Sequence, residues 1–173
     1  DPLRENIVMS LETCFGQERN LFEEGADHAQ RVVVDSPVLS ESRFNQLVSL
    51  GDSDSEYKSV TISLAYEPSI GLEAAVDAVV AQAEQAMRDG AVLVVLSDRG
   101  VTEDQLPIHA LLATGAVHQR LIKAGLRCNG NIVVETATAR DSHHFAVLLG
   151  NGATAIYPYL AYATLNDLIQ TGE

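Results

Sequence analysis

The chain has 173 residues, 46% of them hydrophobic, which suits one domain with a buried core and is unlike a disordered protein. Its 24 acidic residues outnumber its 11 lysines and arginines, and the formal net charge is −13 at pH 7. Nucleic acids and anionic membranes are gripped by clustered basic side chains, so this balance argues against both as partners. A local pocket can still hold a small anion.

The two cysteines and the ends of the chain bear on its cellular setting. Cys14 and Cys128 are far apart and match no metal-ligand spacing, which favours two buried free thiols over a disulfide. Neither a signal-peptide pattern nor an apolar run of about 18 residues occurs, and we expect a cytoplasmic protein. The chain starts at Asp1 without methionine, which favours excision from something longer.

Residues 1–57 form the least regular part, and we expect an irregular N-terminal arm here. Within it the sequence predicts a short helix over 2–11, a strand at 32–34 and a helix that starts after Ser40 as its N-cap. The polar, acidic stretch 51–56 follows and is the best linker candidate. We therefore place a boundary after residue 57.

Residues 58–173 alternate between strand and helix patterns, which is typical of a parallel sheet with helical crossovers. Strands are predicted near 59–66, 91–96, 131–136 and 153–157. Helices are predicted near 72–88, 107–124, 140–150 and 162–169. Four strands are too few to close an eight-stranded barrel, so we predict an α/β fold with an open or half-barrel sheet, partly TIM-barrel-like.

Polar side chains follow two of these strands where each one ends. Asp98 and Arg99 follow the second strand, and Glu135 and Thr136 follow the third. Open α/β sheets and barrels carry their sites at this edge, so the four residues are candidates for acid–base chemistry. The simpler interpretation is a structural cluster in which the arginine bridges carboxylates and backbone groups. We favour it, because no phosphate loop or metal pattern lies beside these residues.

The histidines do not have the spacing of a metal site. His143 and His144 are neighbours on a helix, and adjacent helical side chains point about 100° apart, so they cannot face one ion as an i, i+4 pair can. His109 and His118 also lack a suitable spacing. We therefore predict no metal site.

Two further features have ordinary structural explanations. The turn at 150–153 precedes a strand instead of opening a helix, so we interpret it as a helix C-cap and not as a phosphate cradle. Tyr157, Tyr159 and Tyr162 follow the last strand, and we interpret them as a core edge or a domain interface.

Several segments carry a family resemblance over nearly the whole chain. They are DPLREN at 1–6, IVMSLET at 7–13, GQERNLF at 16–22, VLVVLSDRG at 92–100, LPIHALLATGAVHQRLI at 106–122, LRCNGNIVVETATARDSHHFAVLLG at 126–150 and GATAIYPYLAYATL at 152–165. With these segments the chain resembles the large (alpha) subunit of bacterial NADPH-dependent glutamate synthase. The acidic stretch around 51–57 is the variable part.

The resemblance implies a role within a larger enzyme. In that family a glutaminase domain with a first-residue cysteine releases ammonia, and a central domain joins it to a barrel that holds FMN and an iron–sulphur cluster. The similarity is to the later part of the central domain, which implies scaffolding and a contribution to the ammonia tunnel towards 2-oxoglutarate. The implied partners are the glutaminase and FMN domains and the small subunit, with NADPH as reductant.

The same resemblance implies that the chemistry lies elsewhere in the enzyme. No position matches the nucleophilic cysteine, the flavin contacts or the cluster cysteines, so we expect no catalytic, cofactor or metal residue in this chain. The isolated chain should fold and be inactive. Met9, Ser10 and Glu12 combine polar groups with an apolar surrounding in a family-like segment, and they are candidates for the tunnel or the glutaminase interface.

Two other functions stay open at this point. The chain can be an independent α/β barrel-type enzyme or small-ligand domain that uses Asp98, Arg99 and Glu135. It can also be a protein-interaction module that exposes its sheet edge. Uncovered edges would in addition favour self-association of the fragment.

Overall fold

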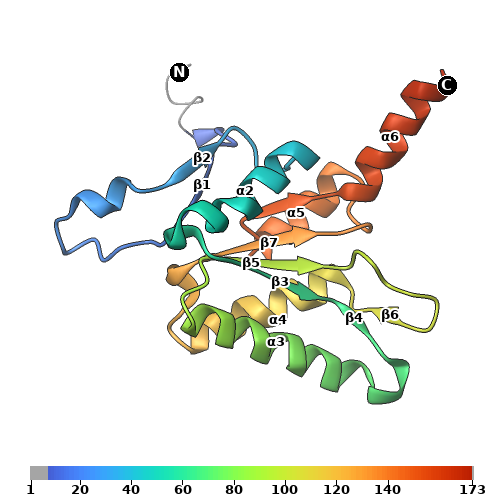
Figure 1. Ribbon diagram of the computed structural model, residues 1–173, viewed down its shortest axis with the longest axis horizontal. Helices are drawn as coiled ribbons and strands as arrows, with labels where there is room; N and C mark the ends of the chain where they lie inside the picture. Colours follow the sequence, from blue (N-terminus) through green and yellow to red (C-terminus); the bar gives the residue numbers. More distant parts are fainter. Residues whose placement is uncertain (1–7, 173) are drawn as a thin grey trace.

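The computed structural model describes residues 8–172, and its centre is a four-stranded parallel sheet in the order β3-β5-β7-β8 (Figure 1). These strands span Ser59–Ser63, Leu93–Ser97, Asn131–Glu135 and Ala155–Tyr157. The predicted α/β class and the parallel pairing of the strands are confirmed. The strands follow each other in chain order, as in one half of a barrel, and the sheet stays open.

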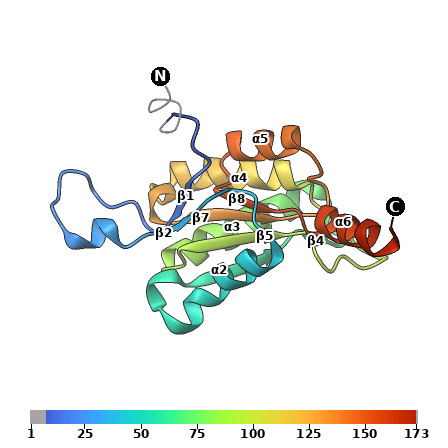
Figure 2. The same ribbon diagram turned by 90° about the horizontal axis from the view of Figure 1, so that it is seen from above.

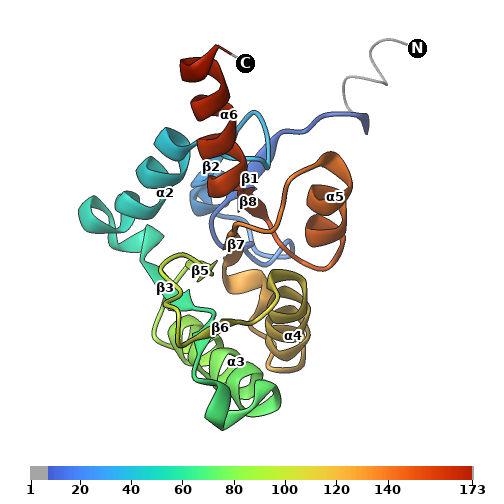
Figure 3. The same ribbon diagram turned by 90° about the vertical axis from the view of Figure 1, so that its right-hand side faces the viewer.

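Three helices cover one face of the sheet (Figures 2 and 3). They are α3 (Leu72–Arg88), α4 (Ala110–Lys123) and α5 (Ser142–Gly150). Every second strand residue points into this layer, among them Val94, Leu96, Ile132, Val134 and Ile156. The buried residues of α3 recur at spacings of three and four, so they share one helix face, and this face packs here: Ala75, Val79, Ala83, Ala86 and Met87.

The other face is covered by the arm, which explains why the sheet does not close. Helix α2 (Glu41–Ser53) and the antiparallel pair β1 (Thr13–Phe15) and β2 (Val32–Val34) belong to this layer. Their buried side chains Phe15, Phe44 and Leu47 pack against the alternate strand residues, such as Val95 and Val133. In a barrel this face would be filled by other strands. The boundary after residue 57 stays a prediction, and residues on both sides of it build this core.

One edge of the sheet is also covered. The backbone of residues 37–39 forms a parallel bridge beside β8, in which the Leu39 amide donates to the Ile156 carbonyl at 2.8 Å. The other edge strand is β3. Helix α6 (Tyr159–Thr171) follows β8, extends away from the sheet and has no buried residue (Figure 1).

Two predicted elements have different bounds in the structure. The strand predicted at 59–66 is divided, because β3 ends at Ser63 and β4 (Ala65–Tyr66) pairs with β6 (Leu106–Pro107) in an antiparallel ladder. The helix predicted from residue 107 is therefore wrong at its start. Its first residue, Pro107, belongs to β6, and His109 is the N-cap that accepts a hydrogen bond from the Leu111 amide.

The arm is more regular than predicted. Helix α2 continues into the linker predicted at 51–56 and ends at Ser53. The 3-10 turn η2 (Ser55–Tyr57) follows, and the Asp54 carboxylate accepts a hydrogen bond from the Glu56 amide at 2.9 Å. Strand β1 was not predicted. The helix predicted over 2–11 lies largely outside the described residues, and residues 9–12 are not helical. The remaining 3-10 turns are η1 (Ala26–Ala29), η3 (Pro68–Ile70) and η4 (Arg127–Asn129).

Arg127 connects three segments by hydrogen bonds: helix α4, the residue before β7 and the turn after α5. Its guanidinium donates to His118 Nδ1 on α4 at 3.0 Å, to the Gly130 carbonyl at 2.8 Å and to the Gly152 carbonyl at 3.0 Å. Gly152 has a φ of 110°, and an added Cβ would lie 2.3 Å from the His118 ring. Only glycine fits there. Because Nδ1 accepts a hydrogen bond from the Arg127 guanidinium, this nitrogen carries no proton and the imidazole is neutral.

The Arg127 contact predicts a pH dependence of stability. Burial lowers the pKa of His118 from its ordinary value of 6.5, and the Arg127 charge lowers it further. The unfolded chain therefore binds this proton more readily, and the stability due to neutral His118 is complete above the unfolded pKa and falls as the pH drops below it. Urea unfolding at about pH 7.5 and about pH 5.5 should show this loss in the wild type. His118→Gln keeps an acceptor without titrating and should lose less; equal losses would contradict the assignment.

Candidate functional site

The carboxyl ends of the parallel strands lie side by side because the strands end in register. Ser63 is the register partner of Ser97, Ser97 that of Glu135, and Glu135 that of Tyr157. The residues that follow these positions are therefore neighbours in space. The strand-end cluster, which we define as Asp98, Arg99, Glu135 and Thr136, lies together at this edge.

Glu135 is the buried centre of one half of the strand-end cluster. One of its oxygens accepts from the Ser97 hydroxyl at 2.6 Å, and the other pairs with Arg99 Nε at 2.7 Å. The Arg99 guanidinium also lies 4.4 Å from the centre of the Tyr159 ring, and it donates to the Tyr157 hydroxyl at 3.4 Å. Both oxygens of the carboxylate are thus engaged, which compensates for its burial.

Asp98 is the centre of the other half. Its carboxylate accepts from the Thr136 hydroxyl at 2.5 Å and from the Ala137 amide at 3.0 and 3.2 Å. Asp98 is 7% exposed and Thr136 is fully buried. The carboxylate of one strand end therefore caps the backbone of the next, and the Asp98 amide in turn donates to the Glu135 carbonyl at 3.2 Å.

The tyrosines beside the cluster stay protonated at neutral pH. Burial raises the pKa of Tyr159 to about 12, and the nearby Asp98 charge adds to this. Burial, with a contribution from Glu41, also raises the pKa of Tyr157, whose ring stacks on Phe44 at 4.7 Å. These phenols form a core edge. With both carboxylates occupied and both phenols neutral, the edge offers no unengaged general base of the kind that acid–base catalysis needs.

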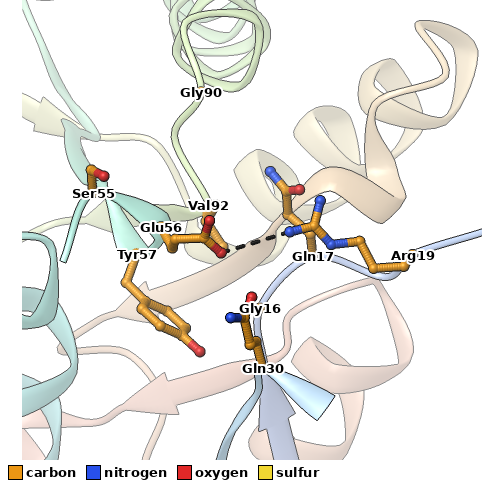
Figure 4. A pocket seen from close by; sticks show the side chains of 9 residues that line it. All are labelled: Gly16, Gln17, Arg19, Gln30, Ser55, Glu56, Tyr57, Gly90 and Val92. Atoms are coloured by element: carbon orange, nitrogen blue, oxygen red, sulfur yellow. Dashed lines mark ion pairs between the residues drawn. The ribbon is translucent and has the colours of Figure 1, made fainter. Parts of the chain in front are cut away.

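A polar hollow of about 230 Å³ lies at the opposite end of the strands, beside the amino ends of β3 and β5 (Figure 4). The residues that line it are Gly16, Gln17, Arg19, Gln30, Ser55, Glu56, Tyr57, Gly90 and Val92. They come from the arm, from η2 and from the turn before β5, so no local motif could have indicated them. Arg19 pairs with Glu56 at 3.7 Å and with Asp27 at 3.3 Å across its rim, and such exposed pairs contribute little to stability.

A second hollow, of about 240 Å³, lies where α4 and α5 begin, and three histidines line it. His109 caps α4 with its ring nitrogen, while His144 accepts from the Arg140 amide at 3.2 Å. His143 is exposed. Among residues 8–172 no group of three or more His, Cys, Asp or Glu side chains is placed to hold a metal ion.

The other candidate residues lie on the arm. Met9 is 74% exposed, and Ser10 and Glu12 are exposed as well, with the Ser10 hydroxyl accepting from the Glu12 amide at 3.1 Å. They precede β1 and do not belong to the strand-end cluster. Both cysteines are free thiols as predicted, but the expected burial is wrong, since Cys14 is half-buried and Cys128 is exposed. Within the described part of the chain, no helix is long and apolar enough to span a bilayer.

Fold and site together define a parallel α/β domain whose strand-end carboxylates are paired within the domain. The chain belongs to the glutamate synthase central domain family, whose family model matches residues 1–173. This confirms the resemblance found in the sequence.

Curated relatives support the assignment at full coverage of this chain. It is 42% identical over 172 residues to the chloroplastic ferredoxin-dependent glutamate synthase of Oryza sativa subsp. japonica, covering 95% of this chain and 10% of that protein. It is 38% identical over 173 residues to the glutamate synthase NADPH large chain of Bacillus subtilis, covering 100% and 11%. The NADH glutamate synthase of Schizosaccharomyces pombe is 35% identical, with 98% and 8% covered. The chain thus spans about a tenth of the length of these relatives.

The strand-end cluster predicts a stability effect at Thr136. Thr136→Val keeps the shape of the side chain but removes the hydroxyl that donates to the buried Asp98 carboxylate, and it should cost about 1–3 kcal/mol of unfolding free energy. Urea denaturation followed by circular dichroism measures it. Thr102→Val makes the same chemical change at an exposed loop position outside the strand-end cluster and should cost less than about 0.5 kcal/mol. Equal costs would show that the buried hydrogen bond does not stabilise the edge.

Proposed function

We propose that this chain is the central connecting domain of a glutamate synthase, an oxidoreductase that makes glutamate from glutamine and 2-oxoglutarate. The observation that carries the proposal is the match of the family over residues 1–173, combined with relatives about ten times longer that are named glutamate synthases. FMN, the iron–sulphur cluster and the reductant NADPH then belong to other parts of the enzyme. The resemblance to the bacterial enzyme supports a cytoplasmic location.

Two features of the structure support a connecting role: its interior is packed and paired, and apolar side chains are exposed at its periphery. Both faces of the sheet are covered, and the strand-end carboxylates are hydrogen-bonded within the domain. Apolar side chains remain exposed at its periphery, on the arm and on α6. Such surfaces suit contact with neighbouring domains. The partners we propose are the glutaminase and FMN domains of the same polypeptide and the small subunit.

We also propose that the start of the arm lies beside the ammonia path or the glutaminase interface. Val8, Met9 and Leu11 are 68%, 74% and 65% exposed and give an apolar surface. Ser10 and Glu12 interrupt this surface with polar groups. An apolar wall with a few polar groups is the environment that carries a small neutral molecule while limiting its exchange with bulk water.

The first test separates the domain from its parent. The polypeptide that contains this chain should form glutamate from glutamine and 2-oxoglutarate, while the 173-residue chain should be folded by circular dichroism, colourless and inactive. It should release no ammonia from glutamine, because it lacks the residues that the resemblance assigns to that step. Stoichiometric FMN in the purified chain, or glutaminase turnover lost in a Cys14→Ala variant, would overturn the proposal and place the chemistry in this chain.

The second test addresses the ammonia path. Met9→Trp in the full-length enzyme adds bulk at an exposed apolar position, and it should lower glutamine-dependent glutamate formation several-fold while ammonia-dependent formation stays near the wild-type rate. Ile122→Trp on α4 is the control, because Ile122 is 49% exposed on the opposite layer. An unchanged ratio of the two rates in Met9→Trp removes the tunnel role from this residue.

A further inference from the structure

The loop between β1 and β2 projects away from the sheet (Figures 1 and 2), and it carries two adjacent exposed apolar residues, Leu21 and Phe22. Leu21 is 90% exposed and Phe22 is 97% exposed, the largest exposures of any large hydrophobic side chains in the described part of the chain. Single exposed hydrophobic residues are ordinary on protein surfaces. An adjacent pair at the tip of a projecting loop is a different feature, because water contacts both side chains almost completely and neither gains from the core.

The tip that carries this pair has a defined shape. The Asn20 side chain accepts from the Phe22 amide at 3.1 Å and donates to Glu23 at 2.9 Å, while the Asn20 carbonyl accepts from the Glu23 amide at 3.0 Å. The base is fastened by the Glu18 amide, which donates to the Cys128 carbonyl at 2.8 Å. A turn held in this way presents its side chains at a low cost in conformational entropy when they are bound.

The surroundings of the pair are acidic. Glu18, Glu23 and Glu24 are exposed on the same loop, and Arg19 is already paired with Asp27 at 3.3 Å. An apolar centre with an acidic rim is complementary to an apolar pocket with a basic rim. A membrane or nucleic acid does not fit, because both are repelled by this charge.

We propose that Leu21 and Phe22 form an anchor that seats in an apolar pocket with a basic rim on another domain of the same polypeptide. The proposal rests on the function proposed above, since this chain spans about a tenth of its relatives and most of the parent lies outside it. Covalent connection raises the effective concentration of the pocket, so a contact of only two side chains is sufficient. Aromatic anchors of this kind carry most of the binding energy of an interface.

Hydroxyl-radical labelling of the full-length polypeptide tests whether the anchor is covered. Labelling of Phe22 in the native protein should be about tenfold lower than in the urea-unfolded protein, because a seated aromatic residue loses nearly all of its contact with water. Ile70 and Leu72, which are 53% and 45% exposed in the domain, serve as the internal reference for an uncovered surface. Equal labelling of Phe22 in both states would overturn the proposal.

A double variant tests what the anchor holds. Leu21→Ser with Phe22→Ser in the full-length polypeptide should raise tryptic cleavage at Arg19 and Arg31 by at least about tenfold, because truncation of an anchor costs at least that factor in occupancy. Ile70→Ser with Leu72→Ser is the matched control and should leave the cleavage rate unchanged. Unchanged cleavage in the anchor variant would contradict the proposal even if the labelling result were positive.

The outcomes separate this inference from the proposed function. A parent that makes glutamate but leaves Phe22 fully labelled refutes the anchor alone. A parent that makes no glutamate refutes the proposed function whatever the labelling shows. Protection of Phe22 that disappears on dilution identifies a second copy of the polypeptide as the occupant and overturns the assignment to the same chain.

Discussion

The burial of the central strands on both faces is the constraint on which the rest of this structure depends. Residues 93–96 of β5 and 132–134 of β7 are fully buried, so their side chains alternate between two separate apolar layers. Each layer must be supplied by other segments, because one sheet face cannot be left in water without losing the burial of apolar area that stabilises the fold. Helices α3, α4 and α5 supply one layer, and the arm supplies the other.

The same constraint determines the chemistry of the strand ends. At the carboxyl ends of β5 and β7, the polar residues Asp98 and Glu135 lie at the border of the core and are still shielded from water. An unpaired buried carboxylate costs several kcal/mol, on the order of the whole net stability of a small domain, so Asp98 and Glu135 must be paired. Thr136, Ser97 and Arg99 provide these partners. A strand edge that in many α/β enzymes serves catalysis is here used to hold the strand ends together.

The periphery of the domain has the opposite character from its interior. The buried carboxylates of the strand ends are paired, whereas Met9, Leu21, Phe22 and the apolar residues of α6 extend into water. This distribution is understandable for a part of a long polypeptide whose other domains cover such positions.

The sequence by itself determined those features that depend on local periodicity. The helix pattern over 72–88 predicted the observed bounds of α3. The apolar runs predicted strands near 91–96 and 131–136, and the polar residues at their ends placed Asp98 and Glu135 at one edge. The turn at 150–153 ends α5 as predicted, because capping depends on neighbouring residues. The family resemblance rested on residues of these same segments.

Only the tertiary structure decided the features that depend on partners distant along the chain. The pairing of β4 with β6 shortened α4, and two-residue strands have too little periodicity to be predicted. Phe15 and Phe44 of the arm cover the sheet face opposite α3, α4 and α5, where they pack with Val95 and Val133. No local sequence pattern encodes this contact. The partners of Asp98 and Glu135 likewise come from neighbouring strands. Local propensity sets where elements form, and the requirement to bury each remaining apolar face and to pair each buried polar group sets how they assemble.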